Sequence, residues 1–157
     1  MKRWILYILI VAALAWLNQK NPGGKDLTEL EPVEVIRLIE SGQGVTVETD
    51  TGRTGSGKDL NAALQDMARS ADKRLFLETA DYLLVNESAT VYLQQLTALL
   101  RPSCKVCLEE GYADIGKVAA YLRLHDPKIT LKMYRIHPVP LAKLVVMGEK
   151  IYLAASK

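Results

Sequence analysis

Cysteine, histidine and phenylalanine are scarce in this sequence of 157 residues, which has two cysteines, two histidines and one phenylalanine. Two cysteines are too few for a disulfide-rich scaffold. The formal net charge of +2 is too small to indicate nucleic acid as the main partner. Hydrophobic residues at 49% and charged residues at 24% exclude an intrinsically disordered chain. The length fits a single domain of ordinary size.

One hydrophobic run stands out at the N-terminus. Trp4 to Leu17 contains no charge, glycine or proline, and Lys2 and Arg3 precede it. A basic start followed by an apolar run is typical of an export signal, with the basic residues kept in the cytoplasm. The alternative is a buried helix, but a run that is apolar all round leaves no face for solvent. The sequence therefore predicts that the chain after Leu17 lies outside the cytoplasmic membrane.

Whether this segment is cleaved is a separate question. A helix over Trp4–Leu17 would be about 21 Å long, short of a hydrocarbon core of about 30 Å. Snorkelling of the flanking lysines and arginine can make up the difference. Ala13-Leu14-Ala15 matches a cleavage site but lies inside the run. We expect an uncleaved single-pass anchor over residues 1–20, a spacer over 21–31 and an extracytoplasmic domain over 32–157; a cleaved signal would make the protein secreted.

The rest of the chain predicts an α/β (α+β) domain in which about three helices pack on a mixed sheet. Apolar runs at 33–39 and 45–49 flank a Gly-containing turn, which indicates a β-hairpin. The first run could instead be a short helix beginning at Pro32. A second hairpin is expected over 141–147 and 151–155, around Gly148-Glu149.

Between the hairpins, short apolar runs alternate with helical patterns. Asp59, Asn86 and Asp114 are the expected helix caps. Strands are expected at 75–77, 82–85 and 104–109, and a glycine-rich loop at 51–58; residues 129–136 fit either a strand or a short helix. The strand–helix–strand order from Tyr82 to Glu109 predicts a parallel crossover.

The segment Gly52–Lys58 (GRTGSGK) matches the GxxxxGK pattern of a phosphate-binding loop. Asp59 follows where Ser or Thr should bind Mg²⁺, and its carboxylate would repel phosphates. We therefore interpret this segment as a glycine-rich turn and expect no nucleotide.

Cys104-Lys105-Val106-Cys107 forms a CxxC motif. Redox motifs of this type place the first cysteine at a helix start, where the helix dipole lowers the thiol pKa. Here the flanking residues favour a strand, in which positions i and i+3 point to opposite faces. A zinc site would need two further ligands, and His125 and His137 are the only histidines. Two structural thiols are the favoured interpretation, and Cys104 and Cys107 remain the redox candidates.

Paired carboxylates are also present, but they indicate no catalytic site. Glu109-Glu110 and the acids around the central helices are more typical of solvated faces and caps. The acids in question are Asp66, Asp72, Glu78, Asp81, Glu109 and Glu110. No residue set predicts a catalytic site, a metal site or a bound cofactor.

Three segments of the central chain carry a family resemblance. They are the helix Gly57–Met67 (GKDLNAALQDM), Lys73–Leu77 (KRLFL) and Tyr82–Ala89 (YLLVNESA). With the preceding strand and loop, residues 45–110 resemble the N-terminal domain of the spore-germination receptor C-subunit family, Ger(x)C. The resemblance implies a non-catalytic, membrane-tethered protein of an endospore-forming Gram-positive bacterium, acting in sporulation or germination complexes.

The predicted function is that of a binding or structural accessory protein. The membrane is one expected partner, through residues 4–17, and an envelope protein is the other. The alternative is an extracytoplasmic thiol redox or metal-binding protein that uses Cys104 and Cys107.

Overall fold

The computed structural model describes residues 30–154, so the predicted anchor and most of the spacer lie outside the described residues. The strands are β1 (Leu30–Pro32), β2 (Val35–Ser41), β3 (Gly44–Thr49), β4 (Thr54–Gly57), β5 (Arg74–Phe76), β6 (Tyr82–Val85), β7 (Lys105–Glu110), β8 (Lys143–Met147) and β9 (Lys150–Ala154). The helices are α2 (Leu60–Ser70), α3 (Leu93–Leu96), α4 (Ile115–Leu124) and α5 (Leu131–Ile136), with 3-10 turns η2 (Leu77–Thr79) and η3 (Ser88–Tyr92).

A seven-stranded mixed sheet in the order β4-β3-β2-β6-β7-β8-β9 forms the centre of the fold. Strands β2, β6, β7 and β8 run parallel, whereas β3, β4 and β9 are added by antiparallel hairpin pairing at the two sides. The mixed α/β prediction is confirmed, with four α-helices within residues 30–154 where about three were expected. No helix within residues 30–154 has the length and apolar character needed to cross a bilayer.

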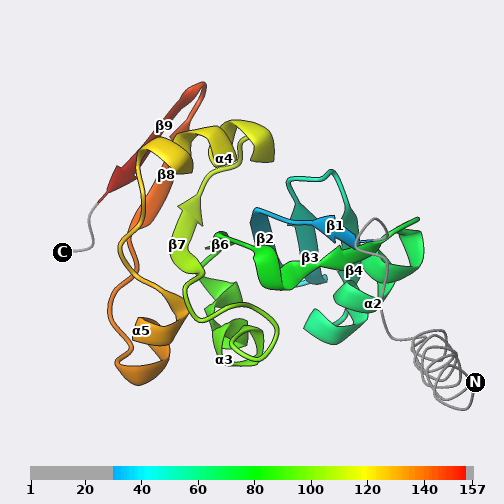
Figure 1. The fold of residues 1–157 in the computed structure, drawn as a ribbon. Coiled ribbons are helices and arrows are strands. Elements are labelled where there is room, and N and C mark those ends of the chain that lie inside the picture. The colour runs from blue at the N-terminus through cyan, green and yellow to red at the C-terminus, as the bar shows by residue number, and fades with distance from the viewer. Residues whose placement is uncertain (1–29, 155–157) are drawn as a thin grey trace, which may run out of the picture.

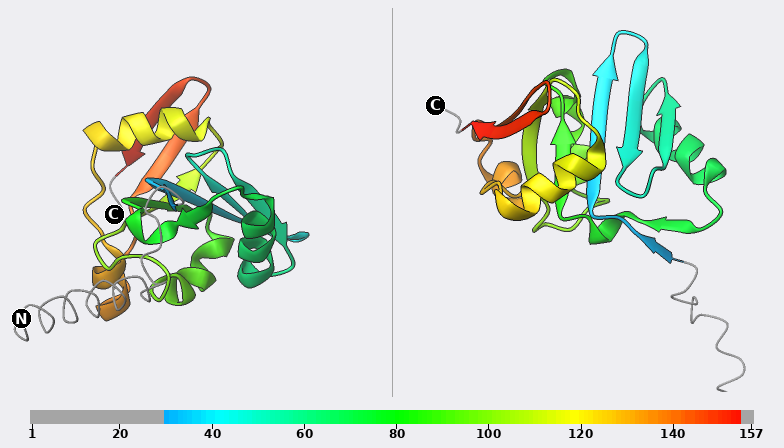
Figure 2. Two further views of the ribbon diagram at one scale, coloured as in Figure 1. Left: turned by 45° about the vertical axis from the view of Figure 1, so that its right-hand side comes forward. Right: turned by 90° about the horizontal axis from the view of Figure 1, so that it is seen from above.

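Helices cover both faces of this sheet (Figures 1 and 2). Helix α4 lies on one face, where Ile115, Val118 and Leu122 pack with Leu84 of β6. Helices α2, α3 and α5 lie on the other face, which holds the larger core cluster. We call this second side the α2/α3/α5 face.

Both predicted hairpins are confirmed. Strand β2 pairs antiparallel with β3 from Ile36↔Thr49 to Ser41↔Gly44, so the alternative of a helix beginning at Pro32 is wrong. At the other end of the chain, β8 pairs antiparallel with β9 around Gly148, whose φ of +61° suits a tight turn. The crossover from β6 to β7 is parallel, as expected.

The prediction of a loop over 51–58 is wrong in its second half, because Thr54–Gly57 forms the edge strand β4. Helix α2 packs directly on this strand. A Cβ atom at Gly55 would lie 2.2 Å from the carbonyl oxygen of Ala63, and one at Gly57 would lie 2.5 Å from the Cβ atom of Ala62. The glycines are therefore needed for close helix–strand approach.

The expected strand over 75–77 exists but lies outside the main sheet. Strand β5 pairs in parallel with β1 in a separate two-stranded sheet, from Leu30↔Arg74 to Pro32↔Phe76. Because the sequence pattern predicts a strand but not its neighbour, this small sheet was not foreseen.

The helix expected after Asn86 is shorter and more irregular than predicted. It consists of η3 followed by one turn of α3; Val91 of η3 is 69% exposed, and Leu99, which lies beyond α3, is 38% exposed. Helices α2 and α4 match their predictions, since Asp59 and Asp114 accept hydrogen bonds from the amides of Ala62 and Lys117. The sequence of residues 129–136 fits either a strand or a short helix, and the structure shows helix α5 there, capped by Thr130.

Candidate functional site

The outer edges of the main sheet are partly closed by side chains. On β4, the amide of Ser56 donates to Oδ2 of Asp66 at 3.0 Å. On β9, the amide of Leu153 donates to the hydroxyl of Tyr121 at 2.9 Å. An edge strand attracts a partner strand through its unpaired amides and carbonyls, so these contacts discourage pairing at either edge. The main sheet is therefore not the most suitable binding surface.

An apolar groove lies instead between helix α2, strand β5 and the chain that follows α3. It consists of two neighbouring hollows of about 360 and 470 Å³, which share Arg74, Leu75, Leu77 and Leu99 in their lining. We call this feature the β5 groove. Its apolar lining comprises Leu30, Leu64, Met67, Ala68, Ala71, Leu75, Phe76, Leu77 and Leu99.

Hydrogen bonds fix the strand wall of the β5 groove to the main domain. The hydroxyl of Thr79, at the end of η2, accepts from the amide of Val33 at 3.0 Å and lies 2.9 Å from the Val33 carbonyl. An ion pair between Glu31 and Arg53, 3.4 Å long, holds β1 against the loop before β4. These contacts make the strand wall a preformed feature, because residues distant in sequence anchor it.

The rim of the β5 groove carries charges of both signs. Lys73 and Arg74 are exposed beside Asp72 and Glu78, and all four side chains line one or both hollows. The walls are apolar, and the charges at the rim are of both signs. This combination fits an uncharged apolar segment better than an ion. Sequence reasoning missed this site because Leu75 and Leu77 were expected to be core residues of a buried strand, whereas both are only half-buried.

The GxxxxGK segment does not form a phosphate-binding loop in its described conformation. Thr54–Gly57 is extended as β4, and Gly55 and Gly57 face α2 at close range. The Asp59 carboxylate accepts from the amide of Ala62 at 2.8 Å and so occupies the N-terminus of α2 with a negative charge. An anion at this position would meet a carboxylate rather than free amides.

The cysteines of the CxxC motif are free, and both are buried. Cys104 belongs to the core cluster on the α2/α3/α5 face, whereas Cys107 belongs to the cluster under α4. The pKa of each thiol is raised to about 12, mainly by burial, and at Cys107 the nearby Glu109 contributes to the rise. The expected separation onto opposite faces is confirmed, while a redox or metal-binding role remains a prediction.

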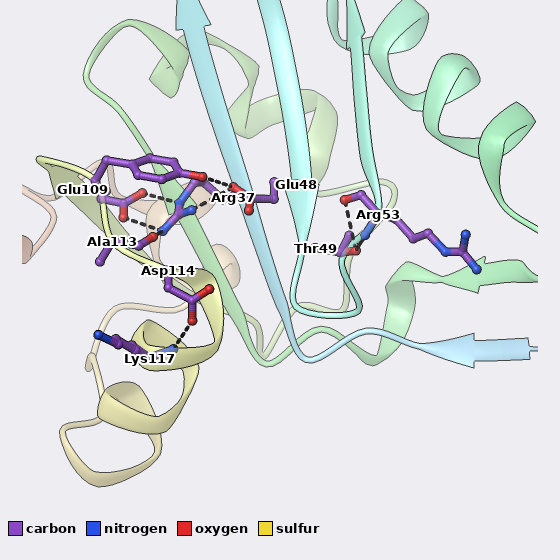
Figure 3. A network of polar contacts seen from close by, with 9 residues as sticks. Arg37, Glu48, Thr49, Arg53, Glu109, Ala113, Asp114 and Lys117 are labelled. Atoms are coloured by element: carbon purple, nitrogen blue, oxygen red, sulfur yellow. Dashed lines mark hydrogen bonds and ion pairs between the residues drawn. The ribbon is translucent and has the colours of Figure 1, made fainter.

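A buried arginine forms the most extensive polar network in the described chain (Figure 3). Arg37 of β2 is 0% exposed. Its Nε and Nη2 donate to the two carboxylate oxygens of Glu109 at 2.7 and 2.8 Å, and Nη1 donates to Glu48 at 2.7 Å. Nη2 also donates to the carbonyl oxygen of Ala113 at 2.6 Å, and the Tyr112 ring covers the guanidinium at 4.5 Å.

This network joins three strands to the loop before α4. Burial by itself lowers the pKa of Arg37, but the hydrogen bonds and charges of Glu109 and Glu48 outweigh it and raise the pKa. Burial raises the pKa of Glu109, while Arg37 opposes that rise. Because Nε, Nη1 and Nη2 of the guanidinium all donate to partners inside the fold, we interpret the network as structural.

Glu109 corrects the expectation that the acidic residues are solvated faces and caps, since it is 8% exposed and paired with Arg37. The other acids match that expectation. Asp81 and Glu110 form surface ion pairs with Arg101 and Lys143, and Asp66 caps β4 as described above. The signal for the buried pair was an arginine in the middle of the apolar run Val33–Ile39, which requires an internal acid.

The two histidines lie apart from the cysteines and are exposed. The ring of His125 stacks on Tyr121 with centroids 4.2 Å apart, and His137 follows the last turn of α5. Within residues 30–154, no group of three or more histidine, cysteine or acidic side chains is arranged to hold a metal ion.

No family model, curated protein or solved structure matches this chain in the comparisons with known proteins.

Proposed function

We propose that this protein is a membrane-tethered, extracytoplasmic accessory protein whose β5 groove holds an apolar segment of a partner protein in the same envelope. The observation that supports this proposal is that Leu30, the first described residue, is part of the groove lining. The chain reaches Leu30 from the proposed anchor Trp4–Leu17 through residues 18–29, which can span at most about 40 Å. The groove is therefore held near the membrane surface, where a membrane-bound partner presents its own segments.

The chemistry of the groove favours a protein segment over a small molecule. Sites for small molecules are concave and combine apolar walls with a few converging polar groups. In the β5 groove, the charged side chains of Asp72, Lys73 and Glu78 are exposed at the rim, and the floor is aliphatic. Leucine side chains that are half-buried in the free protein become fully buried when an apolar segment covers them, which favours association.

The place of this protein in sporulation or germination complexes belongs to the same proposal. It is supported by the resemblance of residues 45–110 to the Ger(x)C family, whose members are non-catalytic. The sequence shows no coherent set of catalytic residues, and a tethered binding protein does not need one.

A pair of matched variants tests the proposal. Leu99, which is 38% exposed, lines both hollows of the groove, whereas Leu124, which is 81% exposed, lies at the end of α4. We expect that a partner recovered with the tagged full chain from crosslinked, detergent-extracted membranes is lost with Leu99→Asp and retained with Leu124→Asp. Circular dichroism of both purified variants checks that each one folds.

Equal recovery of the partner with both variants would contradict the proposed groove. Recovery of the wild-type chain alone would contradict a binding function.

A further inference from the structure

One segment in the C-terminal third of the chain carries charge of a single sign. Residues 127–148 contain three lysines and one arginine but no aspartate or glutamate. The part of the chain after Lys20 has a net charge of −1, because Lys2, Arg3 and Lys20 account for +3 of the total of +2. A basic segment in a slightly acidic domain marks a local interaction surface rather than a general property of the composition.

Helix α5 carries this basic segment on its exposed side. Lys132 and Arg135 are separated by three positions, as are Met133 and Ile136, so a cationic stripe and an apolar stripe lie side by side on the helix. All four side chains are exposed, Met133 by 48% and Ile136 by 56%. The buried Leu131 fixes the opposite side of the helix in the core. We call the exposed side of α5, together with Lys128, the α5 surface.

The cations of the α5 surface are available to an external partner. Lys128, Lys132 and Arg135 form no ion pair with another residue of the described chain, whereas Lys143 pairs with Glu110. The amide of Lys132 donates to the carbonyl oxygen of Pro102 at 3.0 Å, which fixes α5 beside the segment that follows α3. The surface is therefore held in place by the fold and has unneutralised charge.

We propose that the α5 surface docks on anionic phospholipid headgroups of the membrane in which the protein is anchored. This inference rests on the proposed tether. Cations beside exposed apolar side chains are the pattern of an interfacial helix, in which lysine and arginine contact phosphates and the apolar side chains enter the headgroup boundary. An acidic protein partner would account for the exposed cations. It would not account for the exposed apolar side chains of Met133 and Ile136 beside them.

The fold allows the α5 surface and the β5 groove to face the membrane together. Tyr134 of α5 and Leu64, Leu75 and Leu77 of the groove all pack against the same core cluster, on the α2/α3/α5 face (Figure 1). A helix of six residues binds a bilayer weakly by itself. The tether raises its effective concentration at the surface, so that weak docking is enough to orient the domain.

An environment-sensitive dye on the full-length chain tests this inference. Cys104 and Cys107 are buried, so a cysteine introduced at His137, directly after α5, can be labelled selectively. The matched control carries the dye at Leu124→Cys, on the helix that covers the other face of the sheet. Both proteins are reconstituted into vesicles of phosphatidylcholine with or without phosphatidylglycerol, and flotation measures how much of the chain is membrane-bound.

We expect the dye at position 137 to report an apolar environment in phosphatidylglycerol vesicles and water in phosphatidylcholine vesicles. The dye at position 124 should report water in both. Loss of one cationic contact should lower the docking constant about fivefold. The variant K132E/R135E, which loses two such contacts, should therefore abolish the response of the dye at position 137. Salt at about 0.5 M should abolish it as well.

A chain that floats with the vesicles while the dye at position 137 stays in water overturns this inference and leaves the tether intact. An equal response in phosphatidylcholine vesicles, or one unchanged in K132E/R135E, also overturns it. A chain that does not float contradicts the tether and, with it, the docking of α5.

Discussion

Arg37 of β2 and Glu109 of β7 form a bidentate ion pair across the intervening strand β6, with N–O distances of 2.7 and 2.8 Å. Leu84 of β6 lies in register between the two strands, opposite Arg37 on one side and Cys107 on the other. The ion pair therefore spans the sheet at the level where α4 begins. It fixes the loop that carries Tyr112 and Ala113 relative to the hairpin of β2 and β3.

The first prediction concerns this pair. Substitution of Arg37 by Met should lower the free energy of unfolding by about 3–5 kcal/mol, because it leaves the Glu109 carboxylate buried without its partner. The double variant R37M/E109M should recover a large part of that loss, since it removes both buried charges. Urea unfolding followed by circular dichroism measures all three proteins.

The matched control is the exposed pair of Arg123 and Glu34, in which the arginine side chain is 60% exposed. Arg123→Ala should change the free energy of unfolding far less than Arg37→Met, because solvent screens an exposed ion pair. Similar losses in R37M and R123A would show that the Arg37 network is not the stabilising element described above.

The second prediction concerns the two buried thiols and alkaline pH. Burial raises the pKa of Cys104 and Cys107 from 9.0 to about 12, so the folded chain keeps their protons when the unfolded chain releases them. The thiols therefore contribute their full stabilisation below about pH 9, and this contribution is lost as the pH rises towards about 12. Between about pH 8 and about pH 10 the loss should be about 1.4 kcal/mol per thiol.

Urea unfolding of the wild-type chain and of C104A/C107A under reducing conditions measures this difference. The variant should be less stable at neutral pH, but its stability should fall less steeply as the pH rises. Parallel pH profiles would show that the thiols ionise in the folded state.

Reaction of the native protein with a thiol reagent at neutral pH should be slow, and denaturation should expose two thiols. Rapid reaction of both thiols in the native protein would favour the redox alternative.

The third prediction separates packing from phosphate binding at the GxxxxGK segment. Gly55→Ala should destabilise the protein by about 3 kcal/mol, because its Cβ would lie 2.2 Å from the Ala63 carbonyl oxygen. Gly42→Ala is the control, since nothing lies within 4 Å of a Cβ there, and it should change stability by less than about 1 kcal/mol.

ATP with Mg²⁺ should leave the unfolding temperature of the wild-type chain unchanged. A clear upward shift would contradict the interpretation of the GxxxxGK segment as a packing element.

The fourth prediction concerns Asn86, at the end of β6. Its amide side chain accepts from the backbone amide of Glu40 at 3.0 Å and donates to the Glu40 carbonyl oxygen at 2.7 Å, and it also caps Ala89. Asn86→Ala should lower the free energy of unfolding by about 2 kcal/mol. Asn86→Asp keeps the acceptor but loses the donated bond, so thermal unfolding should place it between the wild type and Asn86→Ala. Equal stability of all three proteins would show that these bonds contribute little.

Local signals predicted a large part of the fold. Asp59 and Asp114 begin helices because their carboxylates accept from amides three residues on, a contact that depends only on neighbouring residues. The turn at Gly148 is similarly local. These features could be read from the sequence because the physics that forms them acts over a few positions.

Features that depend on distant contacts could not be predicted in the same way. The sequence predicts a loop where β4 lies because Gly55 and Gly57 are poor strand residues, and only the close approach of α2 explains them. Strand β5 was expected in the core, but its partner β1 draws it into a separate sheet and leaves Leu75 half-buried in a groove. The groove arises from that packing, so the run Leu75-Phe76-Leu77 alone could not indicate it.

Photo-crosslinking from Leu99 tests the central claim, a partner seated in the β5 groove, most directly. A photoreactive amino acid replaces Leu99 in one full-length chain and Leu124 in another, and both are irradiated in intact cells. The account predicts a discrete adduct with a membrane protein from position 99 that is absent from position 124. The same adducts from both positions, or none from position 99, would contradict it.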